Sequence, residues 1–535
     1  MKTIYSGLFH PVGQGLFHSA DLLLGSEKPH PFRYIFDCGA DGQGRLNAAV
    51  EKYLKSLGRK RTLDILFLSH MHKDHVSGLD LLLKGKKGLK GVSHVRQAIL
   101  PYLYPWERAC LLAIAQESEF FLDDPPDWFV DFLKQPAKFL HDAGVEEIVF
   151  VRGGDEPNAN PDTIWISPNP ISPQSKQKEH DFSEQGLKGY PLDRRREAEI
   201  REVEASMSGD EYGSYSRFVT SVAPLQMGAW VFILFNKELD PDKLQQLKEG
   251  FESLRGSLEL EQVLRMKAKV VELTSLYKQV FGQNRLNDSS LALFSGYVVK
   301  GLDTVDVQFE WENGLRRIQS EFELRTVDGF DALGFLFTGD LPVNQAWREF
   351  ARKFGQDGGD VKLHNQVYQV PHHGSRHNWN TEQLSILHNP VYAISAGLKR
   401  RHHPSPSVLA DLANANKSIA RVHETDHLAH QLVVTVGVAE LPAVQRPSLA
   451  AAYARGVIRP GQTLYFDYTP RGGSKQHFEG ILQPHGIEVG GTRYSSLSKA
   501  ALACIQSVCS SRRSANGWTI WRDASETSLL DLLNR

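Results

Sequence analysis

The chain has 535 residues, with 61 Lys and Arg against 63 Asp and Glu, 41% hydrophobic residues and 23% charged residues. These values are ordinary for globular proteins, so they exclude a disordered chain, a collagen-like chain, a coiled coil and a protein that holds nucleic acid by bulk charge. Four cysteines without C-x-x-C spacing, no visible signal peptide and no membrane-length apolar run predict a cytoplasmic protein with free thiols and no membrane partner.

The first third of the chain alternates strand-like and helix-like segments, which predicts an α/β architecture. The run LDILFLS (63–69) is apolar, has the length of a strand and ends in a polar turn, as a buried strand does. We expect further strands and helices in this region: strands at 3–9, 16–24, 33–36 and 95–101, a helix at 46–57, and a second helix that begins at 76.

The middle of the chain is less regular, and we predict a mainly helical insertion over about 102–285. Within it, 104–145 and 240–279 have helical patterns, whereas 170–216 is polar and charged and is predicted to be exposed or mobile. Regular alternation then returns, with strands expected at 289–294, 333–338, 367–370 and 391–395. A proline-containing linker at 441–463 precedes a predicted small domain at 464–535.

The strongest chemical signal is SHMHKDH (69–75), which follows the predicted buried strand directly. A turn there can direct His70 and His72 at one cation, and Asp74 and His75 at a second. Imidazole nitrogens and carboxylate oxygens suit zinc, manganese or iron. A metal lowers the pKa of bound water from ~15.7 to as low as ~7, so such a site would supply hydroxide at neutral pH.

The H-x-H-x-D-H pattern resembles the signature of the metallo-β-lactamase superfamily, and other superfamily landmarks follow in order. The resemblance implies an αββα sandwich over 1–440. It also implies roles for three further residues. Asp37 (in IFDCG) would brace the metal loop, Asp340 (in FLFTGD) would bridge two metals, and His372 (in VPHHGS) would complete the second metal site.

Several blocks narrow the resemblance to the hydrolase domain of ComEC-type competence proteins. They are HPVGQG, NDSSLAL, FTGD, PHHGS, AISAG with HHPSPSVLADL, and VHETDHLAHQLVVTV. His403 lies where these relatives keep a His and would protonate a leaving oxygen, or else contact backbone at a helix start. His373 would contact substrate, shuttle a proton or act as a further metal ligand, or else have a purely structural role.

One superfamily ligand is missing, because no motif supplies the third His of the first metal. We therefore expect two divalent ions, Zn²⁺ or Mn²⁺, with the first site completed by water, Asn287 or Asp288, or only weakly occupied.

The C-terminal tail differs from the rest of the chain in charge. Residues 441–535 hold 11 Lys and Arg against 6 Asp and Glu, whereas 1–440 hold 50 against 57. The tail resembles a RAMA-type domain in its G-x-x-Y-S-S-x-S-x-A-A and N-G-W-x-x-W motifs, which implies a small α+β fold close to DNA. Candidate phosphate contacts are Lys86, Lys87, Arg400, Arg401, Arg493, Arg512 and Arg513, although solvated loops also explain such residues.

These features predict a metal-dependent phosphodiesterase or nuclease that acts on DNA, in keeping with bacterial defence. Two alternatives stay open because fold does not fix function. One is a hydrolase of another ester or amide, or of a nucleotide messenger. The other is a non-catalytic DNA sensor or scaffold with a degenerate metal site. The insertion would serve as a lid or as a docking surface for a protein partner.

Overall fold

The structure is a computed structural model. It describes residues 2–24, 31–58, 61–117, 125–153, 194–207, 215–220, 224–227, 230–237, 239–258, 262–263, 266–282, 290–300, 304–313, 316–325, 330–346, 349–350, 361–387, 390–400, 402–436, 449–454, 457–470, 473–484, 486–510, 515–529 and 532. The chain forms two compact units, Met1–Gly437 and Val438–Arg535. Both combine helices and strands, which confirms the predicted α/β class.

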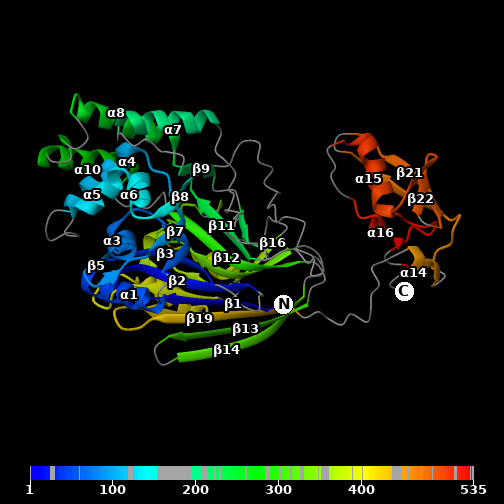
Figure 1. Ribbon diagram of the computed structural model, residues 1–535, viewed down its shortest axis with the longest axis horizontal. Coiled ribbons are helices and arrows are strands. Elements are labelled where there is room, and N and C mark those ends of the chain that lie inside the picture. Colours follow the sequence, from blue (N-terminus) through cyan, green and yellow to red (C-terminus); the bar gives the residue numbers. More distant parts are fainter. Residues whose placement is uncertain are drawn as a thin grey trace. The chain divides into compact units, whose positions relative to one another are not determined.

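The first unit contains a ten-stranded sheet in the order β14-β13-β19-β1-β2-β3-β4-β7-β8-β9 (Figure 1). Strands β3, β4, β7, β8 and β9 run parallel, so their carboxyl ends meet at one edge of the sheet. The strands are β1 (Lys2–Phe9), β2 (Gly15–Leu24), β3 (Phe32–Ala40), β4 (Thr62–Phe67), β7 (His94–Pro101), β8 (Val145–Arg152), β9 (Ser216–Thr220), β13 (Thr304–Asn313), β14 (Arg316–Arg325) and β19 (Leu428–Val436).

A seven-stranded sheet faces the first one, in the order β10-β11-β12-β15-β16-β17-β18. Its strands β15 to β18 are parallel. The two sheets bury one apolar layer between them, to which each contributes large rings such as Tyr34 and Trp230. The strands are β10 (Pro224–Met227), β11 (Trp230–Asn236), β12 (Leu291–Lys300), β15 (Phe330–Phe337), β16 (Val361–Gln369), β17 (Val391–Ser395) and β18 (Ile419–Val422).

Helices pack on the outer face of each sheet, so the inner strands are buried on both faces and have nearly continuous apolar sequences. Helix α1 (Gln43–Ser56) packs on the ten-stranded sheet, and α13 (Pro406–Asn414) packs on the seven-stranded sheet. The helix expected to begin at 76 is instead two, α2 (Lys73–Val76) and α3 (Leu79–Lys84). They separate at Gly78, where a Cβ would meet Cys38 Sγ at 2.6 Å.

The described residues of 102–285 form more helix than strand, but the segment also supplies strands to both sheets. Strands β8 and β9 extend the first sheet, and β10 and β11 extend the second. Its helices are α4 (Pro105–Glu117), α5 (Asp127–Lys134), α6 (Pro136–Asp142), α7 (Arg194–Met207), α8 (Pro241–Arg255) and α10 (Lys267–Phe281). Residues 170–193 and 208–214, predicted to be exposed or mobile, lie outside the described residues. Helix α7 buries Ile200 and Glu204 and exposes residues such as Glu199 and Glu202.

The layer between the sheets also holds polar rings. His18 and His430 each lie 3.4 Å from the hydroxyl of Tyr5, and all three side chains are buried. Burial, with charge repulsion from His430 and His10, lowers the pKa of His18 well below its ordinary value. Burial lowers the pKa of His430 to about 3. The fold therefore holds both imidazoles neutral.

Acidification should destabilise the first unit through these histidines. The unfolded chain takes up a proton at His430 below pH ~6.5, whereas the folded chain does so only near pH 3, so stability falls as pH drops through this window. For His430 alone the loss between pH 7 and pH 5 is about 2 kcal/mol. Urea unfolding at both pH values measures this loss. Between pH 7 and pH 5, the free energy of unfolding of His430→Gln should fall by about 2 kcal/mol less than that of the parent. An equal loss would contradict the neutral imidazole, and His477→Gln, at an exposed site in the second unit, serves as the control.

The second unit has a four-stranded antiparallel sheet, β20-β21-β22-β23, packed against α15. Trp521 lies in its core and donates its indole N–H to the carbonyl of Leu497. Its elements are α14 (Leu449–Ala454), β20 (Thr463–Tyr468), β21 (Gln476–Gln483), β22 (Gly486–Val489), β23 (Thr492–Tyr494), α15 (Leu497–Val508) and α16 (Gly517–Ile520). Over the described residues of both units, no helix has the length and apolar character needed to cross a membrane.

Candidate metal centre

The predicted metal ligands lie on segments that follow strands of both sheets. SHMHKDH (69–75) begins in the loop after β4 and ends in α2, which carries Asp74 and His75, and Asp37 lies within β3. From the second sheet, Asp340 follows β15 and the pair at 372–373 follows β16. Because carboxyl ends of parallel strands share one edge, these loops meet where the two sheets end together.

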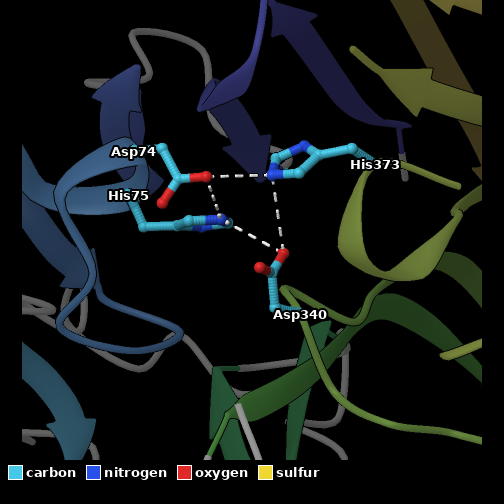
Figure 2. Close-up of side chains that lie close together, drawn as sticks. All are labelled: Asp74, His75, Asp340 and His373. Atoms are coloured by element: carbon cyan, nitrogen blue, oxygen red, sulfur yellow. Dashed lines mark hydrogen bonds and ion pairs between the residues drawn. The ribbon is translucent and has the colours of Figure 1, made fainter. Parts of the chain in front are cut away.

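Figure 2 shows Asp74, His75, Asp340 and His373 pointing toward one another. Oδ2 of Asp74 lies 3.0 Å from Nε2 of His373, and Nε2 of His75 lies 3.2 Å from Oδ1 of Asp340. One ligand atom from each of the four residues lies within 4.8 Å of the others, so this cluster can hold a metal ion.

A second group of donors lies beside the first. Ligand atoms of His70, His72 and Asp74 also lie within 4.8 Å of one another. Nε2 of His70 and Nε2 of His372 lie 3.7 Å and 3.6 Å from Oδ2 of Asp340. The two oxygens of Asp340 therefore face different imidazoles: Oδ1 faces His75, and Oδ2 faces His70 and His372.

Four of these imidazoles are held by a hydrogen bond at Nδ1. His75 donates to Asp37 at 2.7 Å, His373 to the carbonyl of Ser395 at 2.7 Å, His372 to Asn378 Oδ1 at 2.9 Å and His70 to Ser69 Oγ at 2.9 Å. A proton fixed on Nδ1 leaves Nε2 as the nitrogen available to a metal. All four Nε2 atoms turn toward the carboxylates.

Asp37 holds the metal loop in place. Its carboxylate accepts hydrogen bonds from the backbone N–H and the hydroxyl of Ser69, both at 2.6 Å, besides the one from His75. Asp37 adopts a positive φ of 58°, as do His372 (47°) and His373 (55°). Non-glycine residues reach this conformation only at a cost of order 1–3 kcal/mol, and such strain is typical of functional sites.

The charges in the centre favour a cation. Asp37, Asp74 and Asp340 are three carboxylates close to one another. Burial alone would lower the pKa of His75, but these carboxylates raise it well above its ordinary value. Burial would likewise raise the pKa of Asp340, yet the surrounding histidines lower it well below its usual range. The carboxylates of the centre therefore favour a positive charge among them.

Two buried nitrogens provide a direct test of fit. Nε2 of His70 and Nε2 of His75 are buried and face the carboxylate of Asp340 at 3.7 Å and 3.2 Å, but neither has hydrogen-bond geometry with a described residue. A metal bound between these nitrogens and the carboxylate would satisfy all three groups. The donor set therefore fits a divalent cation with nitrogen and oxygen ligands.

His403 lies at the rim of the centre. Its ring centroid is 5.3 Å from that of His372 and 6.2 Å from that of His373. Burial, together with the charges of His373 and His372, lowers the pKa of His403 to about 4, so it is neutral at pH 7. Its role as a proton donor stays a prediction.

The predicted phosphate contacts lie outside the ligand cluster. Lys86 pairs with Glu51, Arg400 with Asp41 and Arg493 with Glu488, and Lys87 is exposed. Of these, Arg400 lies close enough to His403 to help lower its pKa. Arg401, Arg512 and Arg513 lie outside the described residues, as do Asn287 and Asp288.

Sequence reasoning missed the residues that orient the ligands. Asn378 accepts from His372 and donates to the carbonyl of Asp340, so it ties two metal-site loops together. Ser395 acts through its backbone carbonyl, which no sequence pattern identifies. For Asn378 the sequence contains only a weak indication of its role, namely its position three residues after PHHGS.

No protein-family model and no curated protein matches this chain.

Proposed function

We propose that Met1–Gly437 is a metal-dependent hydrolase with the metallo-β-lactamase fold, of the ComEC-type subgroup, acting as a phosphodiesterase or nuclease on DNA. The observation that carries the proposal is the position of Asp340, whose two oxygens face two separate sets of imidazoles. A carboxylate placed between two ligand sets is what a bridge between two metals requires.

The proposed ligand sets divide around Asp340. One ion would be held by His70, His72, His372 and Oδ2, and the other by Asp74, His75, His373 and Oδ1. In this arrangement His372 takes the place of the third histidine that the middle of the chain does not supply. His373 is then a ligand rather than a proton shuttle.

Residues around the proposed ligands would hold them in place or exchange protons. Bound divalent ions supply Lewis-acid activation of water and stabilise negative charge. Asp37 and Ser69 hold the loop that carries four of the ligands. Asn378 keeps His372 in register with Asp340. His403, neutral and beside His372, is placed to exchange a proton at the rim.

A phosphodiester substrate is favoured by the proposed cations, which would balance the negative charge of the reacting phosphate. DNA as the particular substrate is supported by the resemblance of the C-terminal unit to a RAMA-type domain. A non-catalytic role would leave the strained, fully oriented ligand set without an explanation.

The test is hydrolysis of single- and double-stranded DNA by the purified chain with Mn²⁺ or Zn²⁺, alongside an Asp74→Ala/His75→Ala variant. Cleavage by the parent alone, with about two metals per chain by elemental analysis, is the expected result. Metal without cleavage of any DNA would point to another ester or amide as substrate. No bound metal would overturn the proposal and favour a scaffold or sensor.

A further inference from the structure

A row of aromatic and cationic side chains lies at the carboxyl ends of β7 and β8, beside α4 (Figure 1). The guanidinium of Arg152 lies 4.9 Å from the ring centroid of Tyr104. The ring of Tyr104 stacks on Trp106 with centroids 4.4 Å apart and planes 10° from parallel. Nζ of Lys248 lies 5.6 Å from the ring centroid of Trp106. Two cations thus flank two stacked rings.

Arg152 is held in one orientation but is not neutralised. Besides lying over the ring of Tyr104, its Nη1 donates to the hydroxyl of Tyr104. It forms no ion pair with a carboxylate in the described part of the chain. The nearby carboxyl of Glu107 instead accepts from the backbone N–H of Tyr104 at 2.8 Å. Burial raises the pKa of this carboxyl to about 7, although the charges of Arg152 and Arg108 oppose the rise. A fixed guanidinium without a direct ion pair is suited to binding an anion.

The register of the sheet places Arg152 at the same sheet edge as the start of the metal loop. Phe67 of β4 pairs with Ile99 of β7, and Ile99 pairs with Val149 of β8. The metal loop begins two residues after Phe67, and Arg152 lies three residues after Val149, at the same edge. Adjacent strands are ~4.8 Å apart, so the end of β8 lies about 10 Å from the end of β4. Ligands of α/β sheets bind outside such carboxyl ends.

Two buried polar atoms near this row lack a partner. Nε1 of Trp106 is a donor, and Oδ1 of Asn236 is an acceptor. Neither forms a hydrogen bond with any residue that the structure describes. Asn236 ends β11 and donates through its amide to the carbonyl of Val151, the residue before Arg152. Buried atoms of this kind need a partner such as a ligand or a water.

We propose that Arg152, oriented by Tyr104, binds a second phosphate of the substrate, next to the one that reacts at the metal centre. The inference rests on the proposed function and narrows its substrate class. A site with a second phosphate contact selects an oligonucleotide over a compound with a single phosphodiester. Arg152 is a positioning residue, since it ends β8, two strands away from β4, after which the metal loop begins.

The test compares Arg152→Gln with the parent on two substrates. A short single-stranded oligonucleotide carries neighbouring phosphates, whereas bis(p-nitrophenyl) phosphate carries one. A charge-assisted hydrogen bond contributes about 1.5–3 kcal/mol, so kcat/KM for the oligonucleotide should fall about 10–150-fold, mainly through KM. The rate on bis(p-nitrophenyl) phosphate should change little. Arg152→Lys should retain only part of the oligonucleotide rate, because lysine keeps the positive charge but lacks the planar guanidinium that donates two parallel hydrogen bonds to a phosphate.

Arg201→Gln is the matched control. Its guanidinium also lies over a ring, that of Phe218, but it is paired with Glu197 at 2.6 Å, so its loss should leave both rates unchanged. Equal losses on both substrates in Arg152→Gln would indicate a structural role and overturn the inference, as would no loss on either.

A parent that hydrolyses neither substrate would contradict the proposed function itself. Binding of a fluorescein-labelled oligonucleotide by anisotropy then tests Arg152 separately. Weaker binding by Arg152→Gln, with a salt slope lower by about 1, supports the contact, and unchanged binding overturns it.

Discussion

Substitution of Asp340 with Asn should abolish metal-dependent hydrolysis while leaving the fold intact. The side chain keeps its shape, but one of its two oxygens becomes an amide nitrogen that cannot bind a cation. The carboxylate faces His75 through Oδ1 and both His70 and His372 through Oδ2. Whichever way the amide is oriented, its nitrogen therefore replaces the oxygen that serves one of the two proposed ligand sets. We expect kcat/KM to fall by at least about 100-fold, and elemental analysis to show fewer than two metals per chain.

Asp64→Asn is the matched control for this variant. Asp64 is a half-buried carboxylate on β4, near the other end of the strand from the metal loop, where it accepts from the backbone N–H of Arg33 at 2.8 Å. Its removal should leave hydrolysis and metal content unchanged. Full activity of Asp340→Asn with unchanged metal content would show that Asp340 is no ligand, and would exclude the proposed bridge.

The local half of the metal centre was predictable because one turn creates it. Four donors fall within SHMHKDH, directly after an apolar strand, so short-range geometry brings them together. The other half depends on the packing of two sheets. Nothing in the sequence places His373, rather than His372, 3.0 Å from Asp74, because that contact depends on how the loop after β16 turns.

Specific physical causes also explain why some strands and helices were not predicted from the sequence. The hairpin β13–β14 was not predicted, although Asn313-Gly314 between alternating apolar residues is a strong hairpin signal. The strands β8 to β11 were not predicted. Strands β9 and β10 have only five and four residues, and a long polar segment separates β8 from β9. The composition of α7, rich in Arg and Glu, predicts an exposed helix. Its residue Glu204 is buried because its partner, Arg108, lies far away in the sequence.

Loss of that partner contact should destabilise the first unit strongly. Glu204 of α7 accepts two hydrogen bonds from Arg108 of α4, at 2.8 Å each, and a third from the hydroxyl of Tyr102 at 2.9 Å. Both charged side chains are buried. Removal of one member of a buried pair leaves the other charge without compensation, which costs about 3–5 kcal/mol. Glu204→Ala should lower the free energy of unfolding by this amount, which a lower midpoint of denaturant unfolding would show.

A double variant separates the lost charge pair from lost packing. Arg108→Met/Glu204→Leu replaces the pair with apolar side chains of similar size, which is often neutral or stabilising in other proteins. We therefore expect it to be more stable than Glu204→Ala, although the hydroxyl of Tyr102 loses its acceptor in both. Lys138→Ala provides the surface control, because its pair with Asp142 is exposed and such pairs contribute at most about 1 kcal/mol. If Glu204→Ala were as mild as Lys138→Ala, the ion pair would not be what holds α7 against α4.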